Sequence, residues 1–490
     1  MESARNFVKN TGVLLASRVF SIGLGIIYVA VLARYIHAAG IGKIATATSL
    51  VSILILLPNF GLNDLIVRDI AGDKSKTGSY FSNVFFMRGL FSILFGIILV
   101  GITEIIGYPP DTKLIIYIYG FSYVFDALTD IAFSIFTAYE RMEYPAVLQA
   151  GRDLINVVLS LGAIYFHASL TTIVLISAVA SLLKLGAGMV ILRRKYVGSG
   201  SQINPLICRK LLIAALPFAA LAFIALVNHQ INIVLLSLYR PADDVGLFSA
   251  AATLIVYLLL FPNVFIQALF PVFARFNRSS KDALRRTYSL SFKYLMLFGF
   301  PLSAGLFVTA DQVISLVYGS GFQGAVTALR IQAFLLLWMF IWANGTFLNA
   351  TGKQTFFALM NGITVVLNIG LALLLIPRFS YIGSSIARTL PPAIFMLPIT
   401  MVIHKQLEIK FPYSLVIRSL IAALGMGGAV ALSLHFKIHL FISIFAVAPL
   451  VYGSLLAAFR AIGREDLLMV VRILKKRTSL AQVQENATNS

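Results

Sequence analysis

The sequence predicts an all-α polytopic membrane protein with about fourteen transmembrane helices. The chain of 490 residues is 59% hydrophobic and only 12% charged, and its mean hydropathy is +0.90. Soluble domains are about one quarter charged, so this composition indicates a protein embedded in a bilayer rather than a globular enzyme. Long apolar segments also recur at the length of about 20 residues that a bilayer-spanning helix requires. The single cysteine, Cys208, excludes internal disulfides and thiolate metal sites.

Fourteen apolar segments meet the length requirement. They are 12–36, 44–66, 80–102, 114–138, 146–166, 170–192, 211–238, 246–273, 290–309, 325–348, 356–376, 382–403, 413–434 and 438–459. The first is too long for the apolar region of a cleavable signal peptide, and no small-residue cleavage site follows it. An even number of spans places both termini on the same side of the membrane.

Lysine and arginine are distributed unequally between the predicted loops. With the N-terminus inside, the cytoplasmic segments carry 27 of the 39 Lys and Arg residues, and the outer loops carry six. Cytoplasmic loops of membrane proteins show this excess, so we expect a multi-pass protein of the cell membrane with both termini in the cytoplasm. The same bias explains the net charge of +20 without nucleic acid as a partner.

The chain repeats internally. Under a shift of 204 residues, Tyr35, Gly42, Pro58 and Asn59 fall on Tyr239, Gly246, Pro262 and Asn263. Six helices separate the copies, so both have the same orientation and form a parallel repeat. We expect two six-helix lobes around a central cavity, with two further helices and a basic tail. The expected bounds are 1–195 for the first lobe, 196–208 for a cytoplasmic linker, 209–405 for the second lobe, 406–460 for the added helices, and 461–490 for a basic amphipathic helix and disordered tail.

Six cations lie well inside the apolar segments. They are Arg18, Arg88, Arg152, Lys184, Arg330 and Arg388. One such side chain facing lipid costs about 2.5–3.5 kcal/mol, so six would together cost more than the stability of a typical fold. We therefore expect them to meet carboxylates, water or an anion. The first four approach the inner face in the first lobe, and the last two approach the outer face in the second.

The acids within these segments are fewer than the cations. They are Asp126 and Asp130, four residues apart on one helix face, Asp153 beside Arg152, and Asp64 at a helix end. Local salt bridges, for example Arg88 or Arg18 with Asp126, would neutralise part of the cation set. The remainder predicts a wet cavity that attracts an anion, and arginine suits phosphate because its planar fork makes two aligned hydrogen bonds. Alternatively, Asp126 and Asp130 bind the H⁺ or Na⁺ that drives transport.

Other polar residues give weaker signals. Asn59 and Asn263 each follow a proline and predict kinks or hinges that shape the cavity. His229, in the polar run at 228–232, is a candidate proton-exchanging group, although a lone histidine is more often structural. The sequence contains no phosphate-binding loop, no His/Glu metal spacing and no nucleophile elbow, so we expect neither an enzyme nor a cofactor.

Two stretches carry a resemblance to a known family. The first is NTGVLLASRVFSIGLGIIYVAVLARYIHAAGIGKIATATSLVSIL followed by FGLNDLIVRDIA, and the second is Val317-Tyr318-Gly319 with Phe322 and 325–331. The chain resembles the polysaccharide-export flippases of the multidrug/oligosaccharidyl-lipid/polysaccharide exporter superfamily along essentially its whole length. The resemblance implies an alternating-access cavity. It also implies that an oligosaccharide linked to a polyprenyl (pyro)phosphate is moved from the inner to the outer leaflet.

Two related activities remain as alternatives. Lipid II flippases share the implied fold but carry an Arg-Asp pair further along the first helix, where this chain has Ile22-Gly23-Leu24-Gly25. Multidrug cation antiporters prefer cavities dominated by acids, whereas cations outnumber acids here. The mechanistic hypothesis is that Arg18, Arg88 and Arg152 hold the phosphate, with Asp126 and Asp130 ordering them. The implied partners are the lipid-linked oligosaccharide, membrane lipids, and the glycosyltransferases or polymerase of the same pathway.

Overall fold

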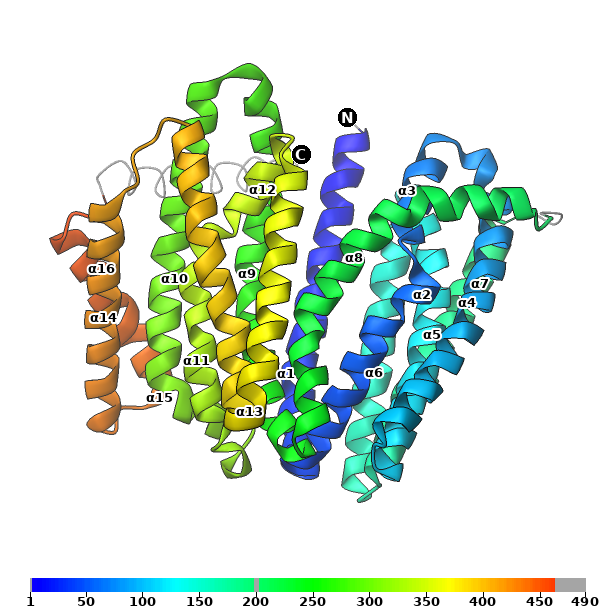
Figure 1. Cartoon of the computed structure of the whole chain (residues 1–490), viewed down its shortest axis with the longest axis horizontal. Coiled ribbons are helices and arrows are strands. Elements are labelled where there is room, and N and C mark those ends of the chain that lie inside the picture. Colours follow the sequence, from blue (N-terminus) through cyan, green and yellow to red (C-terminus); the bar gives the residue numbers. More distant parts are fainter. Residues whose placement is uncertain (1, 198–201, 463–490) are drawn as a thin grey trace, which may run out of the picture. The chain divides into compact units, whose positions relative to one another are not determined.

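The chain is built from long apolar helices. A computed structural model describes residues 2–197 and 202–462, and the predicted amphipathic helix and tail at 461–490 lie almost wholly outside that range. Within the described residues there is no β-strand, and eleven helices are long and apolar enough to cross a bilayer (Figure 1). A chain in hydrocarbon must satisfy its backbone N–H and C=O groups internally, which a helix does within one segment. An all-α architecture is therefore expected for a chain of this apolar composition.

The helices follow the order that the apolar segments predict. Their bounds are α1 Glu2–Leu54, α2 Leu56–Asn59, α3 Leu62–Gly72, α4 Thr77–Ile106, α5 Pro110–Ala138, α6 Glu143–Tyr165, α7 Leu170–Lys195, α8 Pro205–Tyr239, α9 Ala242–Ser279, α10 Lys281–Val317, α11 Ala325–Leu337, α12 Ala343–Ala350, α13 Gln354–Gln406, α14 Tyr413–His435, α15 Leu440–Ile442 and α16 Ala448–Ala458. Short helical turns complete the chain: η1 Lys74–Lys76, η2 Ser320–Phe322, η3 Trp338–Ile341, and a π turn at Ser443–Val447.

Breaks within the helices reconcile eleven long helices with about fourteen predicted spans. A non-helical residue, His37 in α1 and Ser380 in α13, divides each of the two longest helices, so each accounts for two of the predicted segments. The predicted segment 325–348 consists of three shorter pieces, α11, η3 and α12. The prediction of about fourteen helices is therefore confirmed for the part of the chain that the structure describes.

The two predicted proline kinks differ in the structure. Asn59 ends α2, and the next two residues, Phe60 and Gly61, adopt left-handed backbone conformations that separate α2 from α3. Gly61 also packs so closely on α8 that an added Cβ would meet its backbone near Ala219. Asn263, in contrast, lies within α9, which continues through the preceding proline without a break. The hinge expected at Asn263 is therefore not a break of the helix.

The described chain divides into two compact units. Unit 1 comprises 1–258, 314–332 and 355–392, and unit 2 comprises 259–313, 333–354 and 393–490. Unit 1 thus contains α1 to α8 together with the first part of α9, most of α11 and much of α13. The division of the chain into lobes at 195 and 209 stays a prediction.

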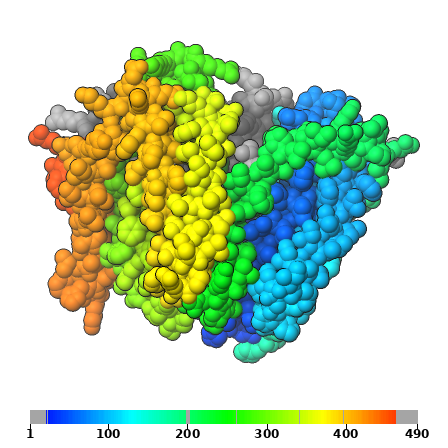
Figure 2. All heavy atoms as spheres, in the orientation of Figure 1, coloured from blue at the N-terminus to red at the C-terminus, as the bar shows by residue number. Residues whose placement is uncertain are grey.

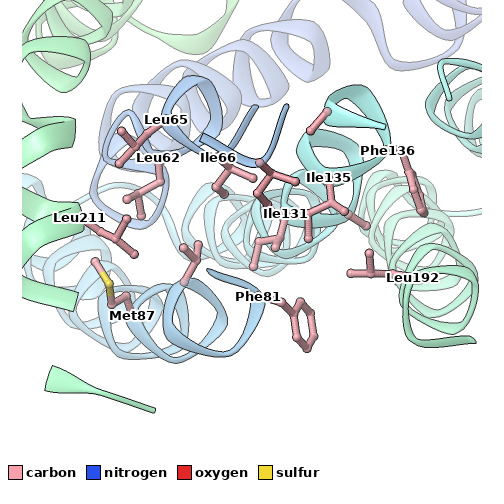
Figure 3. Close-up of a cluster of buried hydrophobic side chains, with 14 of the residues drawn as sticks. Leu62, Leu65, Ile66, Phe81, Met87, Ile131, Ile135, Phe136, Leu192 and Leu211 are labelled. Carbon is pink, nitrogen blue, oxygen red and sulfur yellow. The ribbon is translucent and has the colours of Figure 1, made fainter. Parts of the chain in front are cut away.

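Unit 1 contains a tightly packed apolar cluster. Figure 3 shows Leu62, Leu65 and Ile66 of α3 gathered with side chains from α4, α5, α7 and α8. Among these, Ile131 and Ile135 of α5 are fully buried. Lipid tails are as apolar as leucine, so such contacts stabilise the helix arrangement through close van der Waals packing rather than through exclusion of water. This cluster fixes the relative positions of α3, α4, α5 and α7, which carry the polar residues described below.

Two glycines related by the internal repeat meet in one helix crossing of unit 1. Gly42 of α1 packs against the carbonyl oxygen of Ala242, and Gly246 of α9 packs against the carbonyl oxygen of Ala38. The shift of 204 residues maps Ala38 onto Ala242 and Gly42 onto Gly246, so the two contacts are equivalent. Small residues four apart let helix backbones approach closely in a membrane. At both positions, an added Cβ would overlap backbone rather than a flexible side chain.

This crossing predicts that adding even one methyl group at Gly246 destabilises the protein. Gly246→Ala forces two helix backbones apart, and overpacking of this kind costs about 1–3 kcal/mol. We expect a clearly lower unfolding midpoint for the variant, measured by thermal denaturation of the detergent-purified protein. Gly101→Ala in α4 is the matched control, because its added Cβ meets open space. It should be neutral or slightly stabilising, since alanine favours helix more than glycine does. Equal midpoints for the two variants would contradict the crossing.

Candidate functional site: two polar groups in unit 1

A buried ion pair joins α7 to α5. The ammonium of Lys184 lies 2.8 Å from Oδ1 of Asp126, and only 5% of the lysine side chain is exposed. Lys184 also donates a hydrogen bond to Oε1 of Gln149 at 3.2 Å, and its ammonium lies 5.6 Å from the centre of the Phe133 ring. The lysine is therefore neutralised, hydrogen-bonded and covered by an aromatic ring, which is the environment that a charge in hydrocarbon requires.

Arg88 on α4 is fully buried and is held through an asparagine. Its guanidinium donates hydrogen bonds to the carbonyl oxygen of Ala127 and to the side-chain oxygen of Asn63. The amide of Asn63 in turn hydrogen-bonds to the carboxylate of Asp130, whose charge also interacts with Arg88 and Lys184. Asn63 thus lies between an arginine and an aspartate and connects them without direct contact, while Nε of Arg88 has no hydrogen-bond partner.

A third acid and base lie on neighbouring positions of α6. Nη1 of Arg152 lies 3.3 Å from Oδ1 of Asp153, and about a fifth of each side chain is exposed. Asp153 also accepts hydrogen bonds from Oγ of Ser21 on α1, at 2.7 Å, and from Nε2 of Gln149, at 3.0 Å. Gln149 therefore bridges the Arg152–Asp153 pair to Lys184. Arg18 lies three residues before Ser21 on α1, but its side chain is outside the described part of the structure.

These contacts balance the charge of the first polar group. We call it the paired-charge group: Arg88, Arg152 and Lys184 with Asp126, Asp130 and Asp153. The structure brings all six together through Asn63 and Gln149, as the sequence-based hypothesis of charge partners requires. The partner of Asp126 is Lys184, whereas the sequence suggested Arg88 or Arg18. Three bases and three acids leave no formal surplus within this group.

A second polar group surrounds Arg388 on α13. The guanidinium carbon of Arg388 lies 6.0 Å from the centre of the Phe248 ring, and its charge interacts with His229 on α8. No carboxylate partner of Arg388 occurs among the residues that the structure describes. Arg388 is half-buried and His229 is exposed. This group therefore carries an excess of positive charge.

Two buried amides with unpaired polar atoms contact α13 one turn before Arg388, through Ser385 and Ser384. Nε2 of Gln332 donates to Oγ of Ser385 at 3.2 Å, but Oε1 of Gln332 has no hydrogen-bond partner. Asn232 on α8 is only 1% exposed, and both polar atoms of its side chain lack a partner. A buried polar group left unpaired costs about 1–3 kcal/mol, so such groups are normally occupied by water or ligand. We call Arg388, Gln332 and Asn232 with Ser385 the Arg388 group.

Other predicted residues lie apart from these groups or at their edge. Arg330 is half-buried on α11, two residues before Gln332. Asn59 is half-buried with a side-chain oxygen that has no partner. Sequence reasoning missed the connecting residues Asn63, Gln149 and Gln332. The sequence did contain a signal for them. Each is an uncharged amide within or next to an apolar segment, and burying an amide is costly unless it forms hydrogen bonds.

Comparisons with known proteins identify the family. The family described as polysaccharide biosynthesis protein matches residues 7–277, more than half of the chain. The chain belongs to this family. This agrees with the resemblance to polysaccharide-export proteins seen in the sequence.

Individual relatives are distant. A probable low-salt glycan biosynthesis flippase, Agl15 of Haloferax volcanii, is 24% identical over 250 residues, which is 50% of this chain and 53% of that protein. The chain thus matches about half the length of this curated relative. The fold is that of the lipid II flippase MurJ in an inward closed conformation, with a TM-score of 0.74, 16% identity, and coverage of 93% of this chain and 99% of that one. An inward-facing multidrug transporter of the MATE family is also similar, with a TM-score of 0.60, 16% identity, and coverage of 78% and 95%.

The Lys184–Asp126 pair predicts that the stability effects of substituting Lys184 and Asp126 are not additive. Lys184→Met leaves the Asp126 carboxylate without its cation, and we expect a loss of about 3 kcal/mol in stability, at the lower end for a buried pair because Asp126 is partly exposed. Adding Asp126→Asn should restore part of that loss, because the uncompensated charge is then removed. Thermal unfolding of the single and double variants measures the coupling. The control is Lys113→Met, which breaks the more exposed pair with Glu104 and should cost less than about 1 kcal/mol. Additive effects at Lys184 and Asp126 would refute the pairing.

Proposed function

We propose that this protein is a flippase that carries a polyprenyl-(pyro)phosphate-linked oligosaccharide from the cytoplasmic to the outer leaflet by alternating access. Family membership supports the class of activity, and the fold is one that moves lipid-linked substrates in the lipid II flippase named above. The observation that carries the substrate chemistry is Arg388, a half-buried guanidinium with no described carboxylate partner. The buried amides of Asn232 and Gln332, which contact α13 one turn away, keep unpaired polar atoms.

The two polar groups suggest different roles. In the paired-charge group, each base already meets an acid or an amide, so these residues serve chiefly to hold α3 to α7 in place. In the Arg388 group, the guanidinium and Nδ2 of Asn232 can donate to phosphate oxygens, and the free oxygens of Asn232 and Gln332 can accept from sugar hydroxyls. We therefore shift the proposed phosphate contact from Arg88 and Arg152 to Arg388, with Arg18 and Arg330 as further candidates.

The alternative of a multidrug cation antiporter has less support. A cationic drug would need a carboxylate that is not already neutralised. Asp126 pairs with Lys184, Asp153 pairs with Arg152, and Asp130 interacts with Arg88 through Asn63. Coupling of transport to H⁺ or Na⁺ through Asp126 or Asp130 stays a hypothesis, as do contacts with glycosyltransferases or a polymerase. The orientation with both termini in the cytoplasm also stays a prediction.

The proposal predicts a charge requirement at Arg388. Arg388→Gln removes a charge-assisted bond of about 1.5–3 kcal/mol, so translocation should fall about 10-fold to 100-fold. Arg388→Lys should retain part of the activity, because the charge stays while the fork is lost. Surface glycan in a deletion strain expressing each variant measures export, with membrane levels of the protein compared. The control is Arg378→Gln, an exposed arginine in the same helix. Wild-type export by Arg388→Gln would overturn the assignment.

A further inference from the structure

Unit 2 contains an apolar groove that no part of the described chain fills. The groove lies between α10, η3, the second half of α13, and α14, and its volume is about 360 Å³. Apolar and aromatic side chains line it, among them Phe300, Trp338, Leu397, Met401, Tyr413 and Val416. Figure 2 shows α14 in orange at the molecular surface, so one wall of the groove belongs to an outer helix.

The groove is suited to a hydrocarbon chain. Protein interiors are close-packed, and an apolar cavity of about 150 Å³ already holds a benzene molecule. This groove is more than twice that size, and two of its lining residues, Met401 and Tyr413, are 57% and 64% exposed. Both helices that carry these residues are apolar enough to span a bilayer, so we expect the opening to face lipid. The acyl chain of a bilayer lipid is long, narrow and apolar, so it matches the groove in both shape and chemistry.

Two exposed lysines are close in the chain to residues that line the groove. Lys405 follows Met401 by four residues on α13, so it lies on the same helix face one turn further on. Lys410 adjoins Phe411, which lines the groove. Both lysines are exposed, and neither has a carboxylate partner among the residues that the structure describes. Their charges are therefore available to a ligand.

The nearest acid in the sequence, Glu408, is already engaged. It accepts hydrogen bonds from Lys281, at 2.9 Å, and from Arg285 on α10. These bonds hold the pKa of the Glu408 carboxyl below its ordinary value, so it stays ionised and paired with those two bases at neutral pH. Glu408 thus neutralises α10 rather than Lys405 or Lys410.

We propose that this groove binds one anionic phospholipid, with an acyl chain along α13 and α14 and the headgroup phosphate at Lys405 and Lys410. Charge complementarity selects an anionic headgroup over a zwitterionic one, because each lysine near an anionic lipid contributes about 1 kcal/mol. The groove volume suits part of one acyl chain. The site would be a lipid-binding site of unit 2, and it does not depend on which substrate the protein carries.

The two tryptophans of the chain allow a direct test. The full-length protein with Trp342→Phe keeps only Trp338, which lines the groove. Brominated acyl chains quench tryptophan fluorescence on contact, so vesicles of phosphatidylcholine are prepared with brominated phosphatidylglycerol or with brominated phosphatidylcholine. Each lysine contributes about 1 kcal/mol, or about a fivefold preference, so we expect phosphatidylglycerol to bind about 5-fold to 25-fold more tightly than phosphatidylcholine. Lys405→Gln with Lys410→Gln should abolish the preference.

Matched controls separate this site from general attraction to anionic lipid. Arg418→Gln also removes an exposed cation of α14, but Arg418 is two residues from both Val416 and Leu420, so it lies on the opposite helix face. This variant should keep the preference. Equal quenching by both lipids, or an unchanged preference in the double lysine variant, would overturn the proposal. Displacement of brominated phosphatidylglycerol by an equal mole fraction of a polyprenyl phosphate would overturn the phospholipid assignment in favour of an isoprenoid occupant.

A second measurement does not rely on the tryptophan variant. Native mass spectrometry of the wild-type protein from detergent should show one retained phosphatidylglycerol. Leu397→Trp fills the groove from α13 and should lose that lipid while the protein stays folded and monodisperse. Retention of the lipid by Leu397→Trp would show that it binds elsewhere and would contradict the groove assignment.

Discussion

The need to neutralise charge in a low-dielectric interior governs unit 1. Lys184 is almost fully buried, and it is tolerated because Asp126, Gln149 and the Phe133 ring surround its ammonium. The same requirement brings Arg88 to Asn63 and Asp130. Each of these contacts joins different helices, so α3, α4, α5, α6 and α7 can only be arranged in a way that keeps the charges together. An apolar cluster of buried leucine and isoleucine side chains then fills the space between them.

The Arg388 group differs from the paired-charge group in its charge balance, although both contain buried polar atoms without partners. It combines a cation without a described acid, an asparagine that is 1% exposed with no side-chain partner, and a glutamine with a free oxygen. Such groups reduce stability when nothing occupies them, and proteins retain this kind of cost mainly at functional sites. In a phosphorylated saccharide, phosphate oxygens would accept from Arg388 and from Nδ2 of Asn232, and sugar hydroxyls would donate to the free oxygens of Asn232 and Gln332. This is the physical basis for assigning substrate contact to the second group rather than to the first.

The internal repeat has a counterpart in packing. Gly42 and Gly246 each remove a side chain where a backbone carbonyl of the other helix approaches, and the two contacts obey the same sequence shift. In unit 2 the packing is less complete, because α10, η3, α13 and α14 leave a groove that apolar side chains line. Hydrocarbon solvent explains the difference. A membrane protein can leave a surface groove to a lipid chain, whereas a backbone crossing must be filled by protein alone.

The amino-acid sequence by itself determined the membrane class, the positions of about fourteen helices, the internal repeat and the family, because length, apolarity and motifs are properties of continuous segments. It also identified the cations and acids that had to be neutralised, since any charge in an apolar segment raises that question. It did not determine that Lys184 meets Asp126, or that Asn63 lies between Arg88 and Asp130. Those partnerships depend on the rotation and vertical offset of helices distant in the chain. Only the tertiary structure decided them, and with them that Arg388 has no acid among the residues that the structure describes.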